Sequence, residues 1–167
     1  MILSIVGPDR VGKTTLFEGL RSHVQGAVFV PSVPWSIKLT PVVDAIADRT
    51  EALWEALYRP ELVYVCDRGP FVDNCAYSRM RSPCIHRQLF MTDRLRVLLL
   101  DAESHVLTSR GASSQEVQAR IAYWDILKHF EHCYKLDASK KPETVLADAC
   151  QLVRRLCESY PAVRVKP

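Results

Sequence analysis

The stretch Gly7-Pro8-Asp9-Arg10-Val11-Gly12-Lys13-Thr14-Thr15 decides the fold of this chain, because it fits G-x-x-x-x-G-K-[ST], the pattern of a phosphate-binding loop. Its two glycines allow the backbone to wrap closely around an anion. Successive backbone N–H groups then point at phosphate oxygens, and the following helix adds its free N–H groups and the positive end of its dipole. Lys13 can reach the β- and γ-phosphates of a nucleotide, and the Thr14 hydroxyl can bind Mg²⁺.

The sequence on either side of this loop supplies the context that the motif requires, a strand before it and a helix after it. The apolar run at residues 2–6 is typical of a short buried strand. After the loop, Leu16, Leu20 and Val24 recur every four residues, as they do on one face of a helix. This context favours a phosphate-binding loop over a glycine-bearing turn that merely precedes an ordinary helix.

The rest of the chain alternates strand patterns with helix patterns. Strands are predicted at 27–30, 62–66, 97–100 and 133–136, and helices at about 41–58, 72–80, 86–92, 103–109, 113–130 and from 142 onward. The alternation predicts an α/β fold, with a five-stranded parallel sheet covered by helices on both faces. Ligands of such a sheet bind at the carboxyl ends of its strands. The phosphate-binding loop, Asp67-Arg68 and Asp137-Ala138-Ser139 all fall there, whereas residues 161–167 are expected to form a tail.

The predicted helix at 113–130 carries two further expectations. Ser113-x-x-Glu116 is typical of a capping box, which would open the helix after a small, polar loop. Val117, Ile121 and Trp124 share one helical face, and we expect Trp124 to belong to the core.

Length and composition fit one domain, since the chain has 167 residues, of which 48% are hydrophobic. A net charge of +3 is too mild to argue for a nucleic-acid partner. The apolar stretch at residues 1–6 is too short for a signal sequence or a membrane span, so no membrane is expected. Six scattered cysteines without C-x-x-C spacing are interpreted as free thiols of a cytoplasmic protein.

Asp67-Arg68 follows a buried strand and is the second informative feature. An acid at a strand's tip can hold a magnesium-bound water, and the adjacent arginine can clamp a phosphate with two hydrogen bonds. An ion pair or a plain turn is the structural alternative. Asp101, at the end of another strand, is expected to cap the helix that follows it, and Arg120 is an arginine that could reach a phosphate or a lid.

The sequence resembles the thymidylate kinase family of P-loop nucleoside monophosphate kinases, and the resemblance covers most of the chain. A compact, divergent member of this kind would suit a bacteriophage. The matching segments are Gly7-x-Asp9-Arg10-x-Gly12-Lys13-Thr14-Thr15, Asp67-Arg68 with Ala76-Tyr77 behind it, Leu100-Asp101-x4-Val106, Arg110 with the loop after it, Arg120-x-x-Tyr123, and Leu136-Asp137-Ala138-Ser139.

The resemblance implies a P-loop NTPase three-layer sandwich formed by a single domain at residues 1–167, with a small lid near residues 110–116. It implies transfer of the γ-phosphate of ATP to a deoxynucleoside 5′-monophosphate, with Mg²⁺ as cofactor. Asp9 would contact the 3′-hydroxyl of the acceptor, Arg10 would stabilise the transferring phosphoryl group, and Arg68 would hold the acceptor phosphate.

The implied site residues fall into four groups. They are Lys13, Arg10, Asp67 and Arg68 as catalytic residues; Gly7, Asp9, Arg10, Gly12, Lys13, Thr14, Thr15, Arg110 and Ser139 for ATP; Asp9, Lys38, Arg68, Phe71 and Tyr77 for the acceptor; and Thr14 for the metal.

Three departures from the family concern recognition of the base. Gly69 stands where the family has an aromatic residue, Pro34-Trp35-x-x-Lys38 stands where it has F-P-x-R, and the chain is short. The preferred base, and whether the protein is a homodimer, therefore stay open. A kinase for a nucleoside or a 5′-hydroxyl end is one alternative function. A non-enzymatic nucleotide-binding module is another, although the chain has no N-K-x-D guanine signature.

Overall fold

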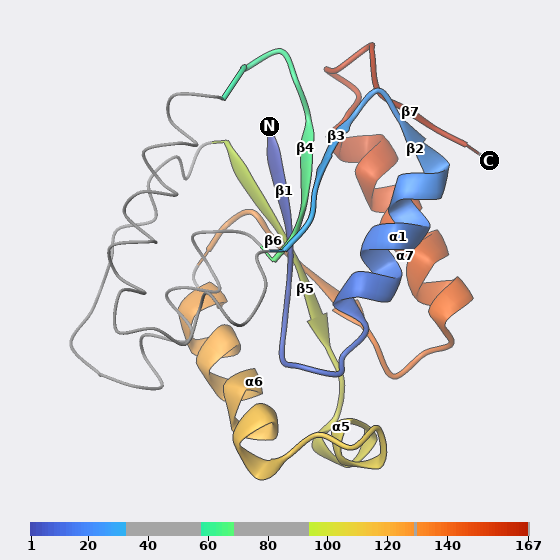
Figure 1. Cartoon of the computed structure of the whole chain (residues 1–167). Helices are drawn as coiled ribbons and strands as arrows, with labels where there is room; N and C mark the ends of the chain where they lie inside the picture. The colour runs from blue at the N-terminus through green and yellow to red at the C-terminus, as the bar shows by residue number, and fades with distance from the viewer. Residues whose placement is uncertain (33–57, 69–93, 129, 167) are drawn as a thin grey trace.

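The structure is a computed structural model, which describes residues 1–32, 58–68, 94–128 and 130–166 (Figure 1). Some predictions lie outside these residues. They are the helices at 72–80 and 86–92, nearly all of the helix at 41–58, and the candidate acceptor residues Lys38, Phe71 and Tyr77.

Five parallel strands form the central sheet, in the order β3-β4-β1-β5-β6. They are β1 (Ile2–Val6), β3 (Val28–Val30), β4 (Tyr64–Asp67), β5 (Leu95–Asp101) and β6 (Cys133–Asp137). This confirms the predicted sheet, although β5 is longer than expected and β4 begins and ends later. All carboxyl ends meet at one edge, with the end of β1 between those of β4 and β5.

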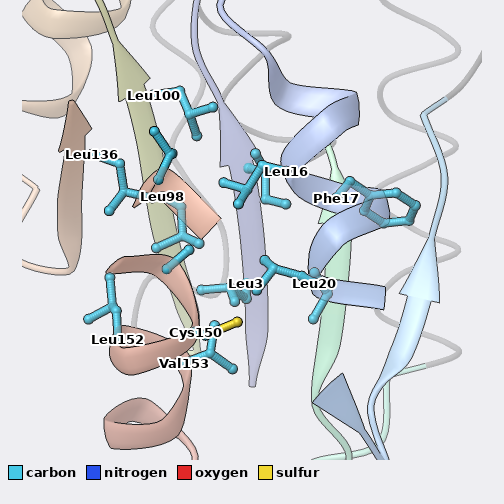
Figure 2. Close-up of a cluster of buried hydrophobic side chains, with 14 of the residues drawn as sticks. Leu3, Leu16, Phe17, Leu20, Leu98, Leu100, Leu136, Cys150, Leu152 and Val153 are labelled. Carbon is cyan, nitrogen blue, oxygen red and sulfur yellow. The ribbon is translucent and has the colours of Figure 1, made fainter. Parts of the chain in front are cut away.

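Alternate residues of the strands point to opposite faces, and each face has its own apolar core. On one face, Leu3 and Leu98 pack with α1 (Lys13–His23) and α7 (Pro142–Leu156), which lie side by side (Figure 2). On the other face, Ile2 and Val97 pack with α6 (Ser114–Leu127), which lies across the sheet from α1 and α7 (Figure 1). The predicted three-layer arrangement is confirmed. The short helix α5 (Ser104–Ser109) joins β5 to α6.

The end of the chain is not the expected tail. Residues Arg164–Val165 form β7, which pairs antiparallel with β2 (Val24–Gln25) directly after α1. The Lys166 amide donates to the His23 carbonyl over 2.8 Å. The expectation that Val24 continues the face of the helix was therefore also wrong, because α1 ends at His23 and Val24 has an extended backbone.

The buried face of α6 differs from the predicted one. Trp124 is 48% exposed and Ile121 is 64% exposed, so the prediction that Trp124 belongs to the core was wrong. The buried side chains are instead Ala119, Tyr123 and Leu127, which are spaced four residues apart. The helix also ends at Leu127, a little before the predicted Phe130.

None of the helices in the described ranges has the length and apolar character that a membrane span needs. The cysteines that the structure describes are free thiols, as predicted; they are Cys66, Cys133, Cys150 and Cys157.

Candidate functional site

The phosphate-binding loop connects β1 to α1, and two of its turns have backbone conformations that only glycine adopts readily. Gly7 has a φ of 145° and Gly12 a φ of 101°, both in the region that favours glycine. A Cβ on Gly7 would lie 2.3 Å from the Leu100 carbonyl oxygen, so β5 and the loop approach each other too closely for any side chain there. Lys13 is buried, and its Nζ donates to the carbonyls of Gly7 over 2.8 Å and Pro8 over 2.6 Å. These bonds hold the loop curled around the lysine.

The Thr14 hydroxyl and the Asp67 carboxylate meet at the start of α1. Parallel pairing of β1 with β4 sets Asp67 opposite Ile5, and the Thr14 Oγ1 donates to Asp67 Oδ2 over 3.1 Å. The other carboxylate oxygen, Oδ1, is buried and has no hydrogen-bond partner within the described part of the chain. A buried carboxylate oxygen left unsatisfied beside a hydroxyl fits a hard cation such as Mg²⁺.

The metal would need further ligands from outside the protein. No group of three or more His, Cys, Asp or Glu side chains that could hold a metal occurs within residues 1–32, 58–68, 94–128 and 130–166. Magnesium commonly binds one or two protein oxygens and completes its shell with waters and substrate phosphates. Thr14 and Asp67 therefore fit this mode of binding, not a self-contained metal site.

Asp9 joins the phosphate-binding loop to the end of β4. Its Oδ1 accepts a hydrogen bond from Arg68 Nη2 and lies 3.5 Å from Lys13 Nζ. Burial alone would raise the pKa of Asp9, but Arg68 and Lys13 more than offset it and hold that pKa below its ordinary value. Arg68 itself has a φ of 63°, a backbone conformation that is uncommon for a residue other than glycine. The loop thus fixes a partly buried cation on the β4 side of β1.

The Arg10 side chain lies near the segment before α6 and near the first turn of α6. A Cβ on Gly111 would lie 3.7 Å from Arg10 Nη1, and Arg10 Nε lies 3.9 Å from Glu116 Oε1. The other Glu116 oxygen accepts from the Ser113 amide over 2.5 Å, and the Glu116 amide donates back to Ser113 Oγ, so the predicted capping box is confirmed. Arg10 is therefore close to the expected lid.

A cavity of about 460 Å³ lies beside the phosphate-binding loop, on the β5 and β6 side of β1. Its walls come from the loop, including Arg10, from one side of α1, from the end of β5 and from the start of α7. Arg110 and Ala138 complete the lining. Arg110 Nη2 donates to the Ala138 carbonyl over 2.9 Å, which ties the expected lid to the turn after β6. Ser139 is not among the described lining residues. Its amide and hydroxyl both donate to Asp137 Oδ1, over 3.0 and 2.5 Å.

Asp101 is the residue whose role the sequence misjudged. It does not cap α5, whose N-cap is Glu103. Its buried carboxylate accepts from Arg120 Nε and Nη2 and lies 2.7 Å from Lys135 Nζ, and these cations outweigh burial to lower its pKa. Its carbonyl accepts from the Ala138 amide over 2.8 Å. Asp101 thus braces the end of β5 against α6, β6 and the turn that lines the cavity, and Arg120 is bound to it.

Comparison with known proteins places the fold. No family model and no curated protein matches the chain. Among solved structures, the YorR protein of Bacillus subtilis, in complex with phosphorylated GDP, is 15% identical with a TM-score of 0.67, over 93% of this chain and 97% of that one. A deoxyadenosine kinase from M. mycoides, with dCMP and a flexible dCDP bound, is 12% identical with a TM-score of 0.62, over 93% and 100%.

A gluconokinase from Sinorhizobium meliloti 1021 is 18% identical with a TM-score of 0.59, over 94% of this chain and 93% of that one. At such identities the likeness shows the fold alone, and it is the fold of P-loop kinases. Membership of the thymidylate kinase family in particular stays a prediction.

Proposed function

We propose that the protein transfers the γ-phosphoryl group of ATP, with Mg²⁺, to the 5′-phosphate of a deoxynucleoside monophosphate such as dTMP. The observation that carries this proposal is the contact between Asp9 of the phosphate-binding loop and Arg68 at the end of β4. It supplies a fixed guanidinium beside the loop, on the side of β1 opposite the cavity. A kinase needs a donor site and an acceptor site, one on each side of the phosphoryl group that is transferred.

The donor half consists of the loop and the cavity. The loop amides and Lys13 would bind the phosphates, with the base in the cavity on the β5 and β6 side. Thr14 and Asp67 would hold the Mg²⁺, which neutralises charge on the β- and γ-phosphate oxygens when bound. Arg10 lies between the loop and the lid segment, where a charge can stabilise the transferring phosphoryl group.

The acceptor half centres on Arg68. A guanidinium can bind two phosphate oxygens at once, which fixes both the position and the direction of an acceptor phosphate. Asp9 holds Arg68 from the loop side, and its carboxylate can accept a hydrogen bond from an acceptor hydroxyl. Acceptor and donor would then be aligned by one short loop.

The transfer itself needs little covalent help from the protein. A 5′-phosphate oxygen forms a bond to the γ-phosphorus while the bond from that phosphorus to the β,γ-bridging oxygen breaks, which gives ADP and the deoxynucleoside diphosphate. The attacking oxygen is already ionised near neutral pH, so no strong general base is required. The protein contributes alignment and charge, from Lys13, Arg10 and Arg68.

A nucleoside kinase is the second candidate, and one observation favours it. Arg68 is already paired with Asp9, and a hydroxyl group could hydrogen-bond to such a pair without displacing it. The similarity in fold to a deoxyadenosine kinase agrees with this alternative. The two candidates differ in what Arg68 does, because a nucleoside has no phosphate for it to hold.

Steady-state kinetics of Arg68→Lys separate the two candidates. Lysine keeps the charge but cannot bind two oxygens in a plane, so the KM for the monophosphate should rise and kcat should fall, while the affinity for an ATP analogue stays the same. Arg164→Lys is the matched control, because Arg164 is an exposed residue of β7, and it should behave as wild type. An unchanged KM in Arg68→Lys, or phosphorylation of nucleosides as fast as of monophosphates, would favour the second candidate.

A further inference from the structure

Arg10 is an exposed cation of the phosphate-binding loop, and its guanidinium lies against the segment that leads into α6. The side chain is 54% exposed, so its long stem can adopt many rotamers unless a neighbour restricts it. A Cβ on Gly111 would lie 3.7 Å from Arg10 Nη1 and 3.9 Å from its Cζ. Arg10 Nε lies 3.9 Å from Glu116 Oε1. The Glu116 carboxylate therefore faces the guanidinium.

The Glu116 carboxylate is itself held in place, because its other oxygen belongs to the capping box of α6. Oε2 accepts from the Ser113 amide over 2.5 Å, and the Glu116 amide donates to Ser113 Oγ over 3.3 Å. The bonds with Ser113 lower the pKa of Glu116 and Arg10 lowers it further, so the carboxylate is charged near neutral pH. One oxygen thus holds the start of the helix, and the other is presented to Arg10.

The helix α6 is fixed on the sheet one turn beyond its capping box. Arg120 donates from Nε and Nη2 to the two carboxylate oxygens of Asp101, which is buried at the end of β5. The phosphate-binding loop rests on the preceding residue of the same strand, where Gly7 approaches the Leu100 carbonyl oxygen so closely that no Cβ would fit. Loop and helix are therefore anchored on neighbouring residues of β5.

The contact between Arg10 and Glu116 is suited to placing a charge and contributes little to stability. The Glu116 side chain is 29% exposed, and an ion pair at the surface is screened by water and stabilises a fold only slightly. It does restrict where the guanidinium lies. The placement of a charged group matters for a rate, because a displacement of about 1 Å can cost up to about 10²-fold.

We infer that Glu116 is a positioning residue for phosphoryl transfer, because its carboxylate holds the Arg10 guanidinium beside the phosphate-binding loop. This inference rests on the proposed function, in which Arg10 stabilises the transferring phosphoryl group. It gives the capping box of α6 a second role besides starting the helix. Since a carboxylate repels phosphates, Glu116 should act on the rate of transfer through Arg10 and should not strengthen the binding of ATP.

The test is a double-mutant cycle on the whole protein, with Glu116→Gln, Arg10→Ala and the two changes together. The kcat of each protein is measured with radiolabelled ATP, Mg²⁺ and the deoxynucleoside monophosphate that the wild type uses best. Glutamine keeps the capping box, because its amide oxygen can still accept from the Ser113 amide. It has no charge with which to hold an arginine.

Glu116→Gln should lower kcat by about threefold to tenfold, without raising the KM for ATP. In the Arg10→Ala background the same change should alter kcat by less than about twofold, because the group that it positions is gone. Thermal unfolding of Glu116→Gln should have a Tm within about 4 °C of the wild-type value, since an exposed ion pair contributes little. Glu103→Gln is the matched control, because Glu103 is an exposed glutamate before α5, and its kcat should equal that of wild type.

Two results would overturn the inference while leaving the proposed kinase in place. One is a kcat of Glu116→Gln that equals or exceeds that of wild type. The other is an equal loss of kcat in the Arg10→Ala background, which would show that Glu116 acts through the helix and not through Arg10. If the wild type forms no deoxynucleoside diphosphate with any monophosphate, the proposed function fails, and the inference fails with it.

Discussion

Replacing Gly7 by alanine should damage the protein more than the same replacement at Gly12. Both glycines have a positive φ, of 145° and 101°, so alanine is strained at either position by about 1–3 kcal/mol. The Cβ at position 7 would also lie 2.3 Å from the Leu100 carbonyl oxygen, a backbone atom that no side-chain rotation can move. Overpacking of this kind costs about another 1–3 kcal/mol. At Gly12 nothing lies within 4 Å of the added carbon.

Urea unfolding followed by circular dichroism measures the difference. Gly7→Ala should lower the free energy of unfolding by about 2–6 kcal/mol, and Gly12→Ala by about 1–3 kcal/mol. A Gly7→Ala protein that does not fold, beside a Gly12→Ala protein that does, gives the same order. Equal losses, or a greater loss for Gly12→Ala, would refute the close approach of the loop to β5.

Two further predictions concern carboxylates. If Asp9 accepts a hydrogen bond from the acceptor's 3′-hydroxyl, a 2′,3′-dideoxy monophosphate should have a lower kcat/KM, equivalent to a loss of about 1–3 kcal/mol in transition-state free energy. Asp9→Ala should erase most of that difference. Equal discrimination in both proteins would assign the hydroxyl to another residue. The pKa of Asp101 is held low in the folded state, so its stabilisation is full above its unfolded pKa, near 4, and is lost as pH falls through the lower folded value. Wild type should therefore lose stability more steeply than Asp101→Asn below about pH 4 in acid unfolding, and parallel curves would contradict the roles of Arg120 and Lys135.

The features that were predictable from sequence are those whose cause is local. The phosphate-binding loop, the strand before it and the helix after it follow from neighbouring residues, and so does the capping box at Ser113 and Glu116. The five parallel strands were recognisable because each is a continuous apolar run or nearly so. Because the strands are parallel, the segments that follow their carboxyl ends could be placed together at one edge of the sheet.

The features that were missed depend on contacts between distant segments. β2 and β7 have two residues each, too few for any pattern, and they pair only because the fold brings them together. In α6, apolar residues occur on more than one face, so spacing alone could not select Tyr123 over Trp124 as the buried aromatic. The contact of Asp9 with Arg68 spans 59 residues, and the sequence predicted both residues but not their pairing.

The most direct test of the proposed kinase is ³¹P nuclear magnetic resonance of the protein with ATP, Mg²⁺ and each deoxynucleoside monophosphate in turn. We expect the resonances of a deoxynucleoside diphosphate to appear with at least one monophosphate, along with those of ADP. Lys13→Ala should reduce this rate by about 10²-fold to 10³-fold, since a transition-state contact of this kind is worth roughly 3–4 kcal/mol. Formation of ADP and inorganic phosphate alone, or no reaction with any monophosphate, would show that the protein is not a deoxynucleoside monophosphate kinase.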